Sequence, residues 1–195
     1  MGKIILVRHG EVDIKQVDKI DGLEIEEFLN SYNLADIKSS SKPPQKLIDH
    51  ANSCDIIICS NLNRSLSSAK ALNKTPHIID KLFQEANPPY IKTKLLKLSP
   101  KNWLIISRIL WLVGYSKHGE SLKDTKKRAF QASQMLIKLS QNKNIMLIGH
   151  ALFNIFIAKE LRKAGFKGAK IPAKEFWEYG IYCKNGLKTN KYYNK

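Results

Sequence analysis

Two histidines come directly after short apolar segments that are typical of buried β-strands. His9 follows segment 4–7 and Arg8, and His150 follows segment 145–148 after one glycine. Ligands bind at the carboxyl ends of the strands in open α/β sheets, so both imidazoles are expected to face one crevice. A neutral imidazole can attack an electrophile or carry a proton near neutral pH.

Two arginines bring positive charge to the same edge of the predicted sheet. Arg8 precedes the first histidine, and Arg64 stands at the start of a predicted helix after a third apolar segment, 55–59. A guanidinium group is planar and permanently charged, and a helix N-terminus offers N–H groups that favour anions. Two histidines, two arginines and helix N-termini at one edge together indicate phosphoryl chemistry.

The elements that position these residues follow the order of an α/β protein. The three apolar segments do not alternate with polar residues, which is typical of strands buried on both faces of a parallel sheet. Helices are predicted over residues 64–72, 121–142 and 152–165, and a last strand near 179–184. We expect a three-layer α/β/α sandwich with a mostly parallel central sheet.

Length and composition predict one domain over residues 1–195. The chain is 43% hydrophobic and 26% charged, which is ordinary for a globular protein, and one core can extend to about 250 residues. We expect a helical cap-like insertion around 86–118 and a basic tail over 185–195. Within the insertion, the apolar segment 103–113 is expected to pack beside the site; the alternative is a hydrophobic lid or a contact for a membrane surface.

The sequence also predicts the compartment and the absence of a metal. No apolar stretch approaches the roughly 20 residues that span a bilayer, and no signal-peptide pattern is present, so a soluble cytoplasmic protein is expected. Cys54, Cys59 and Cys183 lack the paired spacing of metal ligands and are expected to be reduced thiols.

The net charge of +16 indicates an anionic partner. Residues 1–100 hold 14 basic and 12 acidic side chains, and residues 101–195 hold 19 and 5, so the excess is +2 and +14. Aromatic residues are not interleaved with the lysines of the second half, so no nucleic acid is expected as a partner. No membrane partner is expected either.

The motifs of this chain resemble those of the histidine phosphatase superfamily, which includes phosphoglycerate mutases and broad-specificity phosphatases. The segments that carry the resemblance occur in the family's order: Arg8-His9-Gly10-Glu11, residues 60–65, residues 82–85, Gly119-Glu120-Ser121 and Gly149-His150. They span most of the chain, and each lies in the expected strand or loop context.

The resemblance implies a mechanism without metal or cofactor. His9 would attack phosphorus to give a phosphohistidine. Arg8, Arg64 and His150 would hold the equatorial oxygens. Glu85 would protonate the leaving oxygen and then activate the water that hydrolyses the phosphoenzyme.

Three positions depart from the family pattern. Lys15 stands where many members carry a phosphate-binding asparagine, Ala151 replaces a glycine, and residues 86–89 replace a glycine-rich stretch. Lysine can still contact an anion, as a flexible point charge. These departures argue against a strict mutase and favour a divergent phosphatase or a weakened enzyme. The expected partner is a small phosphorylated substrate or a phosphoprotein. The alternatives are a phosphoglycerate mutase-like phosphotransferase and a non-catalytic basic protein that binds phosphorylated ligands or nucleic acid.

Overall fold

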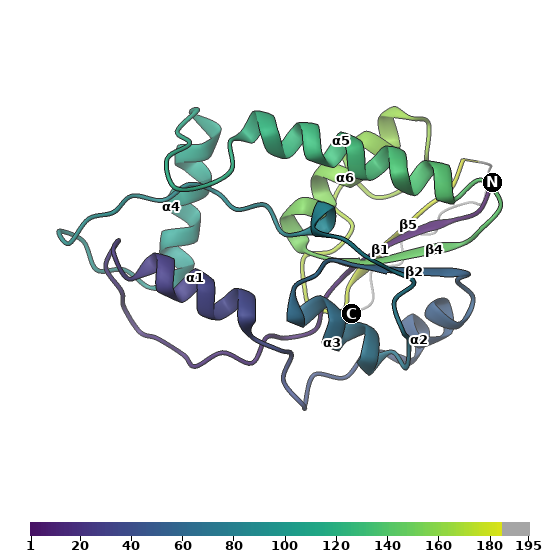
Figure 1. Cartoon of the computed structure of the whole chain (residues 1–195), viewed down its shortest axis with the longest axis horizontal. Helices are drawn as coiled ribbons and strands as arrows, with labels where there is room; N and C mark the ends of the chain where they lie inside the picture. The colour runs from purple at the N-terminus through teal and green to yellow at the C-terminus, as the bar shows by residue number, and fades with distance from the viewer. Residues whose placement is uncertain (185–195) are drawn as a thin grey trace.

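A five-stranded sheet with the order β3-β2-β4-β1-β5 forms the middle layer of the protein (Figure 1). The computed structural model describes residues 1–184, so the predicted basic tail, 185–195, lies outside the described residues. Four strands are parallel, and the last pairs antiparallel with β1. The strands are β1 (Ile4–Arg8), β2 (Ile56–Cys59), β3 (Ile78–Ile79), β4 (Ile145–Gly149) and β5 (Tyr179–Tyr182).

Helices cover both faces of this sheet, which confirms the predicted α/β sandwich (Figure 1). One face carries α5 (Leu122–Leu139) and α6 (Ala151–Lys163), and the other carries α2 (Gln45–Asn52) and α3 (Asn63–Ala71). Side chains alternate between the faces along a strand. In β1, Ile4 and Leu6 therefore pack in the core with α5 and α6, whereas Ile5 and Val7 pack in the core with α2 and α3.

Two further helices form a lobe beyond the carboxyl ends of the parallel strands (Figure 1). They are α1 (Ile25–Leu34) and α4 (Pro100–Leu112). The lobe has its own small core, built around the buried Ile25, Tyr90 and Trp103. The Trp103 indole Nε1 donates a hydrogen bond of 2.8 Å to the Ile20 carbonyl, which joins α4 to the segment before α1. Among residues 1–184, no helix is long and apolar enough to cross a membrane.

Candidate active site

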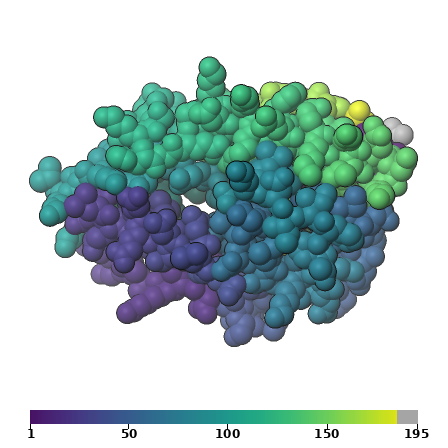
Figure 2. All heavy atoms as spheres, in the orientation of Figure 1, coloured from purple at the N-terminus to yellow at the C-terminus, as the bar shows by residue number. Residues whose placement is uncertain are grey.

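His9 and His150 lie side by side where the neighbouring strands β1 and β4 end. Their ring centroids are 5.2 Å apart, and both side chains are buried. The parallel pairing of the two strands continues past their ends, because the His9 backbone N–H donates to the Gly149 carbonyl at 3.1 Å. The topology thus brings together the two predicted histidines. Figure 2 shows a hollow beside the purple segment that carries α1, between the lobe and the sandwich.

Serines of α3 hold three strand ends in place. The Ser65 hydroxyl donates to the Ile148 carbonyl at 2.5 Å and accepts from the Ser60 N–H at 3.1 Å, which ties the end of β2 to the end of β4. The Ser68 hydroxyl accepts from the Gly10 N–H at 2.9 Å, directly after His9. Because these hydroxyls are buried and fully used, they fix the backbone that carries the histidines.

The His9 imidazole is neutral and has a free ring nitrogen. Its Nδ1 lies 2.8 Å from the Gly10 carbonyl oxygen. A carbonyl oxygen only accepts, so Nδ1 carries the proton and Nε2 keeps its lone pair. Burial first, and then the nearby positive charge of Arg64, lower the pKa of His9 to about 3. At neutral pH the imidazole is therefore unprotonated, which is the form that can act as a nucleophile.

His150 is held by Ser60 and has one ring nitrogen to spare. The distance between Ser60 Oγ and His150 Nε2 is 2.7 Å. Nδ1 is buried and has no hydrogen-bond partner within residues 1–184. Burial, followed by the charge of Arg64, holds the pKa of His150 well below its usual value. Two neutral imidazoles thus face each other in a setting that is rich in positive charge.

Arg64 is a buried cation that forms no ion pair with the described residues. Its side chain is only 1% exposed. Its Nη1 donates to the Tyr32 carbonyl at 3.1 Å and to Asn33 Oδ1 at 3.2 Å, and its Nε has no partner among the described residues. Burying an unpaired charge is costly, so this position suits an anionic ligand.

Arg8 is partly covered by the segment that precedes β5. Its guanidinium donates to the Lys174 carbonyl and lies 4.2 Å from the centre of the Phe176 ring. The Phe176 ring is also 5.8 Å from that of His9. Sequence reasoning missed Phe176, because no motif links this residue to a strand end 167 positions earlier. An aromatic residue just before the last strand was the available signal.

Gly10 is required by the close approach of the same segment. A Cβ atom at this position would lie 2.5 Å from Cζ2 of the Trp177 ring. The Trp177 N–H donates to the Arg8 carbonyl at 3.1 Å, and its indole Nε1 donates to Ser41 Oγ at 2.9 Å. The glycine after His9 thus allows Trp177 to close one side of the site.

Glu85 reaches the site from the loop after the short helix η1 (Lys81–Phe83). Its carboxylate accepts hydrogen bonds from the backbone N–H groups of Phe153 at 2.8 Å and Leu152 at 3.3 Å. These groups belong to the first turn of α6, directly after His150. Burial lowers the pKa of Arg64, whereas Tyr32 and Glu85 raise it. Glu85 is therefore within electrostatic reach of Arg64.

Arg128 of α5, which sequence reasoning missed, holds the loop that carries Glu85. Its Nη1 donates to the carbonyls of Leu82 at 3.0 Å and Gln84 at 2.9 Å. Its Nη2 forms a 2.7 Å ion pair with Glu120, and its guanidinium lies 3.8 Å from the centre of the Phe153 ring. The one sequence signal was the choice of arginine in a helix whose other basic residues are lysines, because only arginine offers such a planar fork.

Lys15 is the predicted site residue that the fold does not bring to the others. It is exposed, and within residues 1–184 no hydrogen bond or ion pair joins it to His9, Arg8, Arg64 or His150. Over the same residues, no group of three or more His, Cys, Asp and Glu side chains is arranged to hold a metal ion.

Comparisons with known proteins point to one family. A family model described as histidine phosphatase superfamily (branch 1) matches residues 4–172. No curated protein matches the sequence.

Solved structures share the fold at low identity. The product of an open reading frame of Mycobacterium tuberculosis is 17% identical, with a TM-score of 0.59 over 92% of this chain and 90% of that one. Phosphoserine phosphatase from Entamoeba histolytica is 23% identical, with a TM-score of 0.54 over 84% and 81%. Mycobacterial glucosyl-3-phosphoglycerate phosphatase is 14% identical, with a TM-score of 0.52 over 83% and 80%.

Proposed function

The chain belongs to the histidine phosphatase superfamily, and on this premise we propose that it hydrolyses phosphomonoesters through a phosphohistidine on His9. The observation that best supports this activity is that three of the four buried side-chain nitrogens without a partner among residues 1–184 belong to predicted site residues. They are Arg8 Nε, Arg64 Nε and His150 Nδ1, and the fourth is Nε2 of His50. Buried polar groups in proteins nearly always have a hydrogen-bond partner. A phosphoryl group supplies the oxygen acceptors that these nitrogens lack.

In the first step, the lone pair on His9 Nε2 attacks the phosphorus atom. A P–N bond forms while the bond from phosphorus to the ester oxygen breaks, and Glu85 gives that oxygen a proton. Arg8 and Arg64 bind the equatorial oxygens, whose negative charge they stabilise in the transition state. The hydrogen bond from His9 Nδ1 to the Gly10 carbonyl orients the ring for this attack.

In the second step, water hydrolyses the phosphohistidine. Glu85, now a carboxylate, takes a proton from the water as its oxygen attacks phosphorus. The P–N bond breaks, inorganic phosphate leaves, and His9 returns to its neutral form. His150 directs its Nδ1 at the phosphoryl oxygens. The hydrogen bond between Ser60 Oγ and His150 Nε2 fixes the orientation of the ring.

A small phosphomonoester is the substrate class that we propose. His9 is buried, the Phe176 ring lies 5.8 Å from its own, and Trp177 packs against Gly10, so the site favours a phosphoryl group that enters end-on. Two of the similar solved structures are phosphatases, one named for phosphoserine and one for glucosyl-3-phosphoglycerate, and both names denote small phosphate esters. These likenesses favour a small substrate over a folded phosphoprotein.

The test compares wild type with His9→Ala in hydrolysis of an aryl phosphate, with a metal chelator present. Wild type is expected to turn over and to yield an acid-labile, base-stable phosphoenzyme when quenched, and His9→Ala is expected to lose both. His50→Ala is the matched control. His50 lies on α2 near Lys3, the residue before β1, whereas His9 follows the other end of that strand. Absence of both turnover and phosphoenzyme in wild type would contradict the proposal. Isomerisation that needs a bisphosphorylated primer, without net phosphate release, would instead identify a mutase.

A further inference from the structure

Only one face of α4 is packed against the protein. Trp103, Ser107 and Trp111 are spaced four residues apart and are buried. The Trp111 indole Nε1 donates to the Glu120 carbonyl at 2.8 Å, so the C-terminal end of α4 is fixed as firmly as its start. Segment 103–113 is therefore packed on this face, and its expected place beside the site stays a prediction.

The opposite face of α4 is apolar and exposed. Ile105, Ile109 and Leu112 recur at intervals of four and three residues, which places them in one stripe along the helix. Their exposed fractions are 45%, 57% and 71%, and the adjoining Val113 is exposed as well. Single exposed apolar residues are ordinary, but a continuous stripe on a rigid helix marks an interaction surface.

Positive charge predominates in the segment that carries this stripe. Between residues 86 and 119 the sequence contains no Asp or Glu. It contains six basic residues: Lys92, Lys94, Lys97, Lys101, Arg108 and Lys117. Lys101 and Arg108 precede Ile105 and Leu112 by four residues, so they lie beside the stripe on the helix surface. Lys92 forms an ion pair with Glu26.

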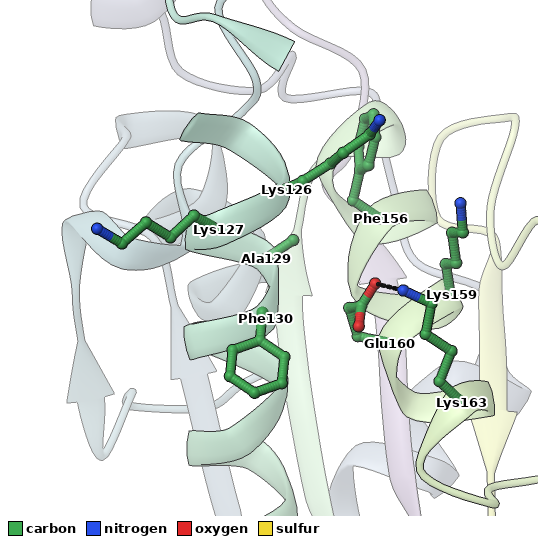
Figure 3. A pocket seen from close by; sticks show the side chains of 8 residues that line it. All are labelled: Lys126, Lys127, Ala129, Phe130, Phe156, Lys159, Glu160 and Lys163. Carbon is green, nitrogen blue, oxygen red and sulfur yellow. Dashed lines mark hydrogen bonds and ion pairs between the residues drawn. The ribbon is translucent and has the colours of Figure 1, made fainter. Parts of the chain in front are cut away.

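More lysines lie next to the C-terminal end of α4. The Trp111 ring lies 5.7 Å from that of Phe156 in α6. Phe156 lines a groove of about 390 Å³ between α5 and α6, whose basic residues come from both helices (Figure 3). They are Lys126, Lys127, Lys159 and Lys163, and the last is paired with Glu160 at 2.7 Å. The positive charge thus continues beyond α4 onto the neighbouring helices.

We propose that the stripe of α4, Ile105, Ile109 and Leu112, docks in the interface of an anionic lipid bilayer. A helix with an apolar face and flanking Lys or Arg side chains lies in the plane of the interface, where apolar insertion and attraction to anionic lipids add together. A second copy of the chain fits this face poorly, because it would bring two strongly basic surfaces together. This inference is independent of the proposed hydrolysis. It reverses the sequence-based expectation of no membrane partner, an expectation that stays untested.

The test measures co-sedimentation of the full chain with vesicles of phosphatidylcholine alone and of phosphatidylcholine with 30% phosphatidylserine. We expect binding to the anionic vesicles only, and weaker binding as salt is raised. The triple variant Ile105→Ser, Ile109→Ser and Leu112→Ser is expected to lower the partition coefficient more than tenfold. Ile79→Ser on strand β3 is the matched control, because Ile79 is 54% exposed, close to the exposed fraction of Ile109.

A second pair of variants tests the electrostatic part. Lys101→Gln and Arg108→Gln are each expected to weaken binding to anionic vesicles about fivefold. All variants should keep the circular dichroism spectrum and melting temperature of wild type, since these side chains are exposed. Equal binding to both kinds of vesicle, or equal binding by wild type and the triple variant, would overturn the proposal. So would a concentration-dependent dimer that the triple variant abolishes, because a second copy would then occupy the stripe.

Discussion

The Glu85 carboxylate lies 2.8 Å from the Phe153 amide nitrogen, in the first turn of α6. That helix begins directly after His150, its N-cap residue, whose own side chain forms no capping hydrogen bond. One carboxylate from a distant loop therefore replaces the missing cap and stands next to the second histidine of the site. A change at this position affects both the helix terminus and the proposed proton transfer.

Two variants of Glu85 separate these effects. Glu85→Gln keeps an oxygen that accepts from the Phe153 N–H but cannot give a proton, whereas Glu85→Ala removes cap and acid together. We expect both to lower kcat by about 10²–10⁴-fold, the typical contribution of general acid–base catalysis. Only Glu85→Ala should also lower the free energy of unfolding, by about 1 kcal/mol, as loss of a cap usually does. Steady-state kinetics and urea denaturation measure the two effects.

The leaving group provides the control for this prediction. An ester whose alcohol has a low pKa leaves without protonation, so Glu85→Gln should lose far less activity on p-nitrophenyl phosphate than on an alkyl phosphate. The comparison uses kcat/KM, which reports the phosphorylation step and not the later hydrolysis of the phosphohistidine, in which Glu85 also acts. An equal loss of kcat/KM on both substrates would show that Glu85 does not protonate the leaving oxygen.

Arg128 is predicted to be a positioning residue for Glu85. Arg128→Lys keeps the charge but loses the fork that holds the carbonyls of Leu82 and Gln84, so kcat should fall about tenfold on alkyl phosphates. Arg128→Ala also leaves Glu120 partly buried without its cation, which should cost about 3 kcal/mol of stability. Lys127→Ala, an exposed neighbour on the same helix, serves as the control.

The readout that identifies positioning is again the leaving group. If Arg128 acts through Glu85, the Arg128→Lys variant will show the same increased sensitivity to the leaving group as Glu85→Gln, with unchanged inhibition by inorganic phosphate. A loss of stability without a change in this sensitivity would assign Arg128 a purely structural part.

Burial of His9 predicts that the protein is destabilised by mild acid. The pKa of His9 is about 3 in the folded protein, against 6.5 when unperturbed, because burial and Arg64 disfavour the imidazolium. Between these values the unfolded chain binds a proton that the folded protein does not, so stability rises with pH and is lost as pH falls. His9 alone should lower the free energy of unfolding by about 2 kcal/mol from pH 7 to pH 5.

Urea denaturation of wild type and His9→Asn at these two pH values measures that effect. The variant lacks the titrating group, so it should lose about 2 kcal/mol less than wild type over the interval. His150 is retained in both proteins and acts in the same direction, so it cancels in the difference. Identical pH dependence of wild type and variant would show that His9 is not held neutral by the fold.

Elements with a strong local pattern were predicted well from the sequence. The uninterrupted apolar segments correspond to β1, β2 and β4, because strands buried on both faces leave no polar positions. The helix α6 and its end near Gly165, whose φ of 88° suits glycine, were predicted for similar local reasons. The helices α1 and α2 were not predicted. In α1 only Ile25 is buried, and packing against α3 and α4 accounts for the place of this helix.

Whether a site residue could be predicted also depended on how far apart in the sequence the contacting residues lie. His9 and His150 could be paired from the sequence, because neighbouring parallel strands end at the same sheet edge. The hydrogen bonds of Arg128 to Leu82 and Gln84 join residues more than 40 positions apart, and the contacts of Phe176 with Arg8 and His9 span over 160 positions. No periodicity or motif carries such contacts, since they arise only when the layers pack. The exposed position of Lys15 likewise follows from the course of the loop after β1.

The final prediction concerns the anion pocket itself. Inorganic phosphate that binds the folded protein stabilises it by RT ln(1 + [L]/Kd), so its melting temperature rises with the phosphate concentration. Arg64→Gln should abolish this shift, because Arg64 is a buried cation whose Nε has no partner among residues 1–184. Lys15→Gln should reduce it only slightly, since an exposed lysine contributes at most about 1 kcal/mol. Thermal unfolding with 0–20 mM phosphate, and chloride at matched ionic strength as the control, measures both shifts. An equal shift in wild type and Arg64→Gln would place the anion elsewhere on this basic protein and remove the main support for a phosphoryl site at His9.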